Sequence, residues 1–410
     1  MKICDIAQFY SPLSGGVKRY IHDKKRFLAQ RPGGQHVLII PSHRDAVTRT
    51  ATATVYEIKS PRLIGSRSYR VLIARRRILE AVAAEKPDLI EVGDPYRTAW
   101  LGLLAGRRLG IPVVAFYHSD FPRAISRTVS RFAGPWFDRL VSRPIQRYLR
   151  RLYNRMDATV VASRRLCDIL EACGLQRIVH ISLGTDVDTF YPRNSRDRIR
   201  AELAIPDGTA MLLFVGRLAR EKNIRNLIAS LDHQPPDCPP HHLVLVGDGE
   251  LHDYVCEEAA QRPNLSWLPY CESAHRLADL YSAADLFVHA GKYETFGIVA
   301  LEAQACGTPV MAVREGGLEE AVAGEDPPIL ASDGSPEAIA AAIRQFLRRG
   351  DSPEKRAARR ERIVRHLSIA ATFERLFALY EHLIAGKPAE TFIKEHPEPD
   401  ELHHPPVSTR

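Results

Sequence analysis

Short runs of apolar residues recur along the chain, and polar or turn-forming residues follow each of them. Apolar runs without alternation are typical of strands that helices cover on both faces, as in a parallel sheet. In the first half these runs predict strands at residues 3–9, 36–40, 88–92, 112–117, 158–162 and 178–182. Amphipathic spacing between the runs predicts helices at residues 67–84 and 144–153.

A second series of apolar runs begins after residue 210 and predicts strands at residues 211–215, 243–246, 265–268, 285–289 and 308–313. A last helical pattern covers residues 373–383. Strands that alternate with helices are typical of open α/β sheets. The fold class predicted from the pattern is therefore α/β, with two tandem Rossmann-like, doubly wound domains.

The chain has 410 residues, which suits two domains better than one core. A polar, turn-rich stretch at residues 191–196 marks the expected join, so we predict an N-terminal domain at 1–195 and a C-terminal domain at 196–365. We expect a C-terminal helix at 366–385 to cross back to the first domain. The Pro-, His- and Glu-rich tail at 386–410 is expected to be poorly ordered.

The formal net charge of +8 is divided unevenly along the chain. Residues 1–190 carry 32 Lys and Arg against 16 Asp and Glu, whereas residues 191–410 carry 25 against 33. The basic half should attract an anionic partner, which could be a phosphate, a membrane surface or nucleic acid. No zinc-finger, helix-turn-helix or RNA-binding aromatic motif supports nucleic acid, so we expect none as a partner.

Seven dispersed cysteines form no Cys-x-x-Cys pair and no cluster at metal-ligand spacing; they are Cys4, Cys167, Cys173, Cys238, Cys256, Cys271 and Cys306. Such a set is typical of reduced thiols packed in a core. No apolar run reaches the roughly 20 residues that a membrane-spanning helix needs. The first residues are predicted to be a strand and not a secretory signal. We therefore expect a cytoplasmic protein, and peripheral attachment to the inner face of a membrane stays open.

Two glutamates flank the start of a predicted helix in the second half. Glu294 follows the apolar run that ends at His289. Seven residues, 295–301, separate it from Glu302, which lies on the helix that follows Gly297. Open α/β sheets bind ligands at the ends of their strands, and a helix start favours anions. An exposed acid pair would be the common alternative. The placement favours two carboxylates that hold two parts of one extended ligand.

Three further groups stand at predicted strand ends. Arg217 and Lys222 follow the strand at 211–215, where the alternative is a solvated basic surface. The pair Gly15-Gly16 follows the first strand and opens a helix, which fits either a plain turn or close approach to a phosphate. His118 ends the strand at 112–117, where it is either a structural residue or an active-site residue.

The string from Glu294 through Glu302 to Val310 resembles the Glu-x7-Glu signature of the retaining glycosyltransferases of family four, which have the GT-B fold. The spacing of Arg217 and Lys222 is similar to that of the same family. The resemblance extends from residue 3 to about residue 383 and is most specific from 217 to 310. It implies transfer of a hexose-type sugar from a nucleoside-diphosphate sugar to an acceptor hydroxyl, with retention at the anomeric carbon.

The resemblance also implies residue roles. Glu294 would position the donor sugar, Glu302 the ribose hydroxyls, and Arg217 and Lys222 the diphosphate leaving group. The implied donor-binding set is Gly15, Gly16, Gly216, Arg217, Lys222, Leu268, Tyr270, Glu294, Phe296, Gly297, Ile298 and Glu302. The implied catalytic set is Glu294, His118, Arg217 and Lys222. The departing phosphate would take the acceptor proton in a front-face substitution.

We expect no metal and no cofactor beside the sugar nucleotide, because two cations can do the electrostatic work of a divalent ion. The acceptor stays open. Arginines recur through a stretch with aromatic residues, which fits a membrane-binding face or a solvated helix face equally well: Arg123, Arg127, Arg131, Arg139, Arg143, Arg147, Arg150 and Arg151. We expect a lipid-linked or anionic acceptor or a polysaccharide precursor; a soluble saccharide, or a non-catalytic sugar-nucleotide-binding scaffold, is the alternative.

Overall fold

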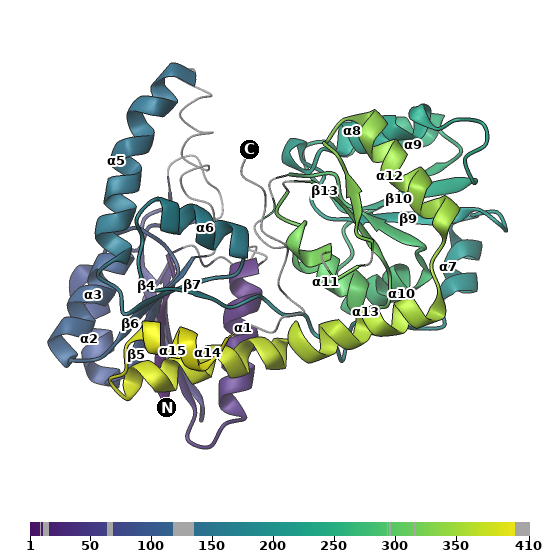
Figure 1. Cartoon of the computed structure of the whole chain (residues 1–410). Helices are drawn as coiled ribbons and strands as arrows, with labels where there is room; N and C mark the ends of the chain where they lie inside the picture. Colours follow the sequence, from purple (N-terminus) through teal and green to yellow (C-terminus); the bar gives the residue numbers. More distant parts are fainter. Residues whose placement is uncertain are drawn as a thin grey trace. The chain divides into compact units, whose positions relative to one another are not determined.

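The computed structural model describes residues 1–8, 10, 16–63, 69–117, 135–292, 294, 297–314, 316–322, 324–325 and 327–397, without the side chains of 135–142. These residues fall into two compact units (Figure 1). Unit 1 combines Met1–Ser182 with Phe373–Pro397, and unit 2 comprises Leu183–Thr372.

The sheet of unit 1 has the order β3-β4-β2-β1-β5-β6-β7-β8, and every neighbouring pair is parallel except the antiparallel β3 and β4. Its strands are β1 (Lys2–Ile6), β2 (Gln35–Ser42), β3 (Ala46–Arg49), β4 (Ala53–Lys59), β5 (Leu89–Val92), β6 (Val113–Tyr117), β7 (Ala158–Val161) and β8 (Ile178–His180). The strand order reverses between β1 and β5, which is the arrangement of a doubly wound sheet.

The helices of unit 1 cover both faces of this sheet (Figure 1). They are α1 (Gly16–Ala29), α2 (Arg75–Glu85), α3 (Arg97–Leu109), α5 (Pro135–Tyr153), α6 (Arg164–Ala172), α14 (Ile369–Ile384) and α15 (Ala389–Glu395). The aromatic side chains of α14 pack on α1, where the ring centroids of Phe27 and Phe377 are 5.6 Å apart. The chain therefore completes its first unit with its last helices.

A buried ion cluster joins α1 and α14 to the sheet of unit 1. The Lys24 ammonium is fully buried and donates to Asp5 on β1 at 2.6 Å and to Glu91 on β5 at 2.7 Å. His36 lies 2.6 Å from the other oxygen of Asp5, and the Tyr380 hydroxyl of α14 donates to Glu91. Burial disfavours the charge on Lys24, but the two carboxylates outweigh it and raise the pKa of Lys24.

The sheet of unit 2 is wholly parallel, with the order β11-β10-β9-β12-β13-β14. Its strands are β9 (Ala210–Val215), β10 (His241–Val246), β11 (Leu265–Leu268), β12 (Leu286–Val288), β13 (Val310–Val313) and β14 (Ile329–Ala331). Successive strands run outward from β9 in one direction and from β12 in the other. The order therefore reverses between these two strands, where doubly wound sheets bind their ligands.

Helices also cover both faces of the second sheet. One face carries α8 (Ile224–Ala229), α9 (His252–Gln261) and α12 (Pro336–Arg349), and the other carries α7 (Arg196–Glu202), α10 (Ala274–Ala283), α11 (Ile298–Ala305) and α13 (Pro353–His366) (Figure 1). Three short 3-10 turns, η1 (Arg220–Lys222), η2 (Ser230–His233) and η3 (Glu320–Val322), connect described elements of this unit. The predicted fold class, two tandem doubly wound α/β units, is confirmed.

The structure differs from the predicted elements in three places. The helix predicted at 67–84 begins only at Arg75, because the preceding backbone bonds as a hairpin in which Val71 donates to the carbonyl of Pro61. The antiparallel strand β3, its partner β4 and the edge strand β14 were not predicted. These strands are short, or their residues are half-exposed or polar. They therefore lack the apolar run that indicates a buried strand.

The unit boundaries also differ from the predicted ones. Residues 183–195, predicted to end the first domain, belong to unit 2, where Thr185 donates its amide to the Leu367 carbonyl. The expected poorly ordered tail contains α15, whose Ala389 and Phe392 are fully buried. Phe392 stacks on His396 at 4.3 Å and packs against His382, so a single aromatic residue anchors a segment that is otherwise polar.

Candidate functional site: the strand ends at the switch point of unit 2

The residues of the predicted donor site gather at the carboxyl ends of β9 and β12. Arg217 and Lys222 follow β9, and Glu294 follows β12. These two strands are neighbours in the sheet, with Leu286 paired to Leu212 and Phe287 to Leu213. The predicted strand-end positions therefore lie where the strand order of unit 2 reverses, a feature that the sequence pattern did not predict.

Two side chains lie beside the carboxylate of Glu294. The Lys222 ammonium, from η1, donates to its Oε2 atom. The Nε2 atom of His289, which directly follows β12, lies 3.7 Å from the same oxygen. Among the described residues, both of these contacts with the carboxylate are made through Oε2.

His289 itself is buried, with about 1% of its surface exposed. Its Nδ1 atom accepts a hydrogen bond from the Gly291 amide at 3.2 Å, and its ring packs on Phe214 of β9 at 5.6 Å between centroids. Burial, with a smaller contribution from Lys222, lowers the pKa of His289 to about 4 against the opposing effect of Glu294. The imidazole is therefore neutral at pH 7.

Two glycines shape the backbone around Glu294. Gly297 adopts a φ of +76°, a left-handed conformation that favours glycine, and caps the start of α11. A Cβ atom on Gly317, in the loop after β13, would lie 1.5 Å from the carbonyl oxygen of Glu294. A side chain at residue 317 would therefore push Glu294 out of place. Ile298 is the first residue of α11, as predicted.

Glu302 lies on the same helix but is almost fully buried, with about 3% of its surface exposed. Its Oε2 atom accepts a hydrogen bond at 3.0 Å from the hydroxyl of Tyr281 on α10. The ring of Tyr281 is fully buried between Phe190 and Phe287. This packing fixes the carboxylate of Glu302 at one position on the inner side of α11. The role of Glu302 with a ribose stays a prediction.

Arg217 is the more exposed of the two site cations. Its guanidinium donates to Glu221, and its side chain is about two-thirds exposed. Gly216 precedes it, and a Cβ atom on Gly247, the residue after β10, would lie 2.0 Å from the Gly216 carbonyl oxygen. Leu268 ends β11 and Tyr270 follows it with 70% of its surface exposed. A large exposed ring near a strand end is available to a planar ligand group.

Several predicted site residues lie outside the described residues: Gly15, His118 and Phe296. Gly16 is described and is the first residue of α1, with open space at its Cβ position. Its predicted contact with a diphosphate stays a prediction.

Two residues of the site were not predicted. The sequence pattern indicates His289 only as the end of a strand, and it gives no indication of Tyr281. The spacing His-x4-Glu after an apolar run is a local signal that could have indicated His289. Tyr281 offers no such signal, since it meets Glu302 only through the packing of α10 on α11.

The sequence also contains the string Asp186-Val187-Asp188, and acids at this spacing can ligate a divalent cation. In the structure the Asp186 carboxylate accepts from the amides of Asp188 and Thr189, both at 3.1 Å, and from the Thr189 hydroxyl at 2.8 Å. Asp186 therefore closes a turn.

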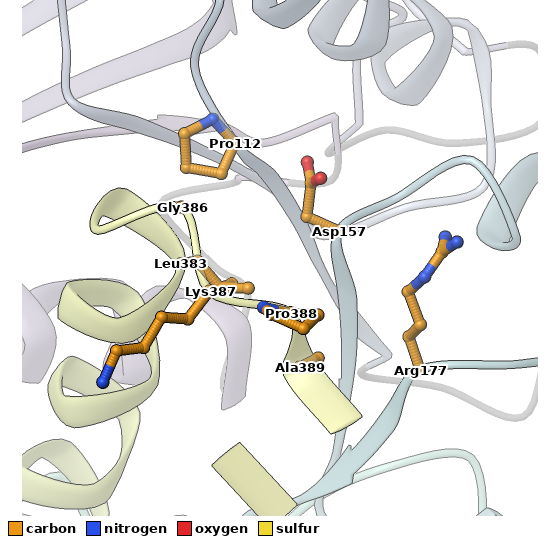
Figure 2. A pocket seen from close by; sticks show the side chains of 8 residues that line it. All are labelled: Pro112, Asp157, Arg177, Leu383, Gly386, Lys387, Pro388 and Ala389. Atoms are coloured by element: carbon orange, nitrogen blue, oxygen red, sulfur yellow. The ribbon is translucent and has the colours of Figure 1, made fainter. Parts of the chain in front are cut away.

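Unit 1 contains a cavity of about 350 Å³, which lies at the amino-terminal ends of its strands. Figure 2 shows Pro112, Asp157 and Arg177 on one side of it and the turn of Leu383 to Ala389 on the other. The guanidinium of Arg177 donates to the carbonyls of Asn154 and Met156 and pairs with Glu390. The cavity contains none of the predicted site residues.

Comparisons with known proteins identify the family of the chain. The family model "Glycosyltransferase Family 4" matches residues 14–189, and "Glycosyl transferases group 1" matches residues 195–363. A GDP-mannose-dependent alpha-(1-6)-phosphatidylinositol dimannoside mannosyltransferase of Mycobacterium tuberculosis is 29% identical over 365 residues, which are 88% of this chain and 91% of that protein. A GDP-mannose-dependent alpha-mannosyltransferase of the same species is 32% identical over 241 residues, 59% of each chain.

Among solved structures, sucrose-phosphate synthase from Thermosynechococcus elongatus matches with a TM-score of 0.73 and 22% identity, over 94% of this chain and all of that one. This likeness shows the fold. None of the helices in the described part of the chain combines the length and apolar composition that a membrane crossing requires. With two family models that together match residues 14–189 and 195–363, the chain belongs to the group 1 glycosyltransferases of family four and has their GT-B fold.

Proposed function

We propose that this chain transfers a mannosyl residue from GDP-mannose to a hydroxyl group of a lipid-linked acceptor, with retention of the anomeric configuration. The observation that carries the proposal is the Glu294–Lys222 pair at the switch point, beside a helix start. The relatives that are named GDP-mannose-dependent support the donor, and one of them is named for a phosphatidylinositol dimannoside acceptor.

In the proposed mechanism each side chain acts on a different part of the donor. Oε1 of Glu294 accepts hydrogen bonds from hydroxyls of the sugar ring, and Glu302 accepts from the ribose. Lys222 and Arg217 contact the diphosphate. Negative charge develops on the diphosphate as the bond from the anomeric carbon to its oxygen breaks, so cations there stabilise the transition state more than the bound donor.

Retention follows if the acceptor hydroxyl attacks from the face that the diphosphate leaves. The acceptor oxygen forms its bond to the anomeric carbon, and its proton passes to the departing phosphate oxygen. No side chain becomes covalently attached in this scheme. Lys222 carries the positive charge needed next to the leaving group, and we propose that the reaction needs no divalent ion.

A basic, aromatic surface on unit 1 supports an acceptor in a membrane. Four arginines of α5 are exposed: Arg143, Arg147, Arg150 and Arg151. Tyr148, on the same helix, accepts a hydrogen bond from the Trp100 indole at 3.1 Å, and the Arg155 guanidinium lies 5.7 Å from the Trp100 ring. Exposed arginines with aromatic rings between them are typical of surfaces that bind anionic lipid headgroups.

A panel of nucleotide sugars tests the proposal. The melting temperature of the purified chain is measured with GDP-mannose, UDP-glucose and ADP-glucose, and transfer of labelled sugar to extracted membrane lipids is measured in excess chelator. We expect GDP-mannose to raise the melting temperature most, because a ligand bound to the native state stabilises it by mass action. Transfer that requires added Mg²⁺, or a larger shift with UDP-glucose, would overturn the corresponding part of the proposal.

A further inference from the structure

The hydrogen bond from the Gly291 amide determines which nitrogen of His289 carries its proton. Nδ1 accepts this bond, so the proton of the neutral ring sits on Nε2. Nε2 is the atom that lies 3.7 Å from Oε2 of Glu294. At 3.7 Å this N–H group is beyond direct hydrogen-bond distance, and it acts on the carboxylate as a nearby dipole from the buried His289 side.

The position of the His289 ring is fixed by its surroundings. One face packs on Phe214, and the ring is about 1% exposed. Residue 291 is tightly enclosed, since a Cβ atom there would lie 3.0 Å from Cε1 of His289 and 2.9 Å from the Glu221 carbonyl oxygen. The Gly291 amide can reach the imidazole only because residue 291 has no side chain.

Glu294 and Lys222 are the ionisable groups that act on His289. The imidazole stays neutral between them because burial, aided by the Lys222 ammonium, lowers the pKa of His289 to about 4. A neutral N–H orients the carboxylate without cancelling its charge, whereas an imidazolium would form a full second ion pair. Glu294 thus keeps its negative charge toward the ligand side.

We propose that His289 is a positioning residue of the donor site: the dipole of its Nε2–H group, together with the hydrogen bond from Lys222, favours the orientation of Glu294 in which Oε1 accepts from a hydroxyl of the donor hexose. The inference rests on the proposed function, because it assigns Oε1 to the sugar of a nucleoside-diphosphate sugar. His289 touches Glu294 and not the donor, so it acts on the sugar only through that carboxylate.

Two substitutions separate this role from simple packing. His289→Phe keeps an aromatic ring against Phe214 and removes both nitrogens, while His289→Gln keeps an amide N–H donor of similar reach. The matched control is His242→Phe in the same unit. His242 is also buried, and it bonds Ser266 at 2.8 Å from the amino-terminal part of β10, away from the switch point.

The experiment measures kcat and KM for GDP-mannose and the Kd for GDP in the wild type and the three variants. We expect His289→Phe to lower kcat/KM by roughly 10- to 100-fold through a misplaced carboxylate. His289→Gln should recover much of that loss, and His242→Phe should match the wild type. The Kd for GDP should not change in any variant, because GDP has no hexose.

If the wild type is active and His289→Phe has the same kcat/KM, the role of His289 is overturned and the proposed function is not. The same holds if His289→Phe loses affinity for GDP to the extent that it loses kcat/KM. A wild type without transfer or hydrolysis of any nucleotide sugar would contradict the proposed function and the positioning role with it. The nitrogen NMR spectrum of the chain with isotope-labelled histidines gives a readout that does not depend on activity. The signal of His289 is the one that is missing in the spectrum of His289→Gln. We expect the neutral Nε2–H tautomer at pH 7; a charged ring or the Nδ1–H tautomer would contradict the geometry.

Discussion

The ammonium of Lys222 and the carboxylate of Glu294 form an ion pair although 72 positions separate them in the chain. Each follows a different strand, and those two strands are neighbours in the sheet of unit 2. Both side chains are only about a fifth exposed, so the pair is shielded from bulk water on most sides. A ligand that enters here meets one cation and one anion that are already in place.

Replacement of either partner should lower the rate of transfer. We expect Glu294→Gln and Lys222→Met each to reduce kcat/KM by about 100-fold or more, because each removes charge that acts on the donor in the transition state. The double variant should lose less than the product of the two single losses, since the partners act on each other. Steady-state kinetics with GDP-mannose measures all three.

Glu361→Gln is the matched control for Glu294→Gln, because Glu361 is an exposed acid of the same unit whose carboxylate pairs with Arg365. Its activity should equal that of the wild type. If the fold-losses of kcat/KM in the two single variants multiply in the double variant, the ion pair between Lys222 and Glu294 has no functional importance.

Removal of the Tyr281 hydroxyl should weaken nucleotide binding. In Tyr281→Phe the Oε2 atom of Glu302 loses its 3.0 Å hydrogen bond inside a buried pocket. The carboxylate then has one hydrogen bond fewer to fix its orientation, and we expect the Kd for GDP to rise about 5- to 10-fold. Isothermal titration with GDP and with guanine base alone gives the comparison. If Tyr281→Phe loses as much affinity for guanine base, which has no ribose, as for GDP, the effect does not act through the ribose.

Loss of the Lys24 ammonium should destabilise unit 1. Lys24→Met leaves the Asp5 and Glu91 carboxylates buried with no cation between them, and breaking a buried ion pair in this way costs about 3–5 kcal/mol. Urea unfolding followed by tryptophan fluorescence measures the change. Lys25→Met, on the neighbouring position of α1, should change the free energy of unfolding by less than about 0.5 kcal/mol. Equal stability of the two variants would mean that the cluster contributes nothing.

The stability of unit 2 should depend on pH through His289. Burial lowers its pKa to about 4 in the folded chain, from 6.5 in the unfolded chain. Between these values the unfolded chain binds a proton that the folded chain excludes, so the free energy of unfolding rises as the pH rises through this window. We expect the wild type to gain up to about 3 kcal/mol relative to His289→Phe between pH 4 and pH 6.5. Parallel stability profiles of the two proteins would contradict this.

Reversal of charge on α5 should weaken attachment to anionic vesicles. Arg147→Glu/Arg151→Glu removes two exposed cations, each worth about 1 kcal/mol at an anionic surface, so binding should fall about 30-fold or more. Co-sedimentation with phosphatidylglycerol vesicles measures it. Arg348→Glu/Arg349→Glu makes the same charge change on α12 of unit 2 and should leave binding unaltered. If both double variants sediment equally with the vesicles, α5 is not the membrane-binding surface.

The sequence predicted the placement of residues on strands, loops and helix starts well wherever the signal is local. An apolar run followed by a polar loop and a helix start placed Glu294, Gly297 and Ile298 where the structure has them. Arg217 and Lys222 followed from the same logic at β9. Since parallel strands present their carboxyl ends at one edge, residues at separate strand ends come together without any knowledge of the tertiary contacts.

The remaining features depend on contacts that no local pattern encodes. Tyr281 meets Glu302 through helix packing, and Tyr380 reaches Glu91 across 289 positions. Strand β3 is short and mostly exposed, so its sequence resembles a loop, and its partner β4 mixes apolar with polar residues and lacks a continuous apolar run. Helix α15 has only Ala389, Phe392 and Ile393 as apolar residues and lies in a Pro-, His- and Glu-rich stretch, so its sequence alone indicates a tail.

The stereochemistry of the transferred sugar tests the central claim most directly. Proton NMR of the product made from GDP-α-D-mannose in excess chelator identifies the configuration at the anomeric carbon. The account predicts an α-linked product from the wild type and from Glu361→Gln, and none above background from Glu294→Gln. A β-linked product, or full activity in Glu294→Gln, would contradict a retaining donor site built on Glu294 and Lys222.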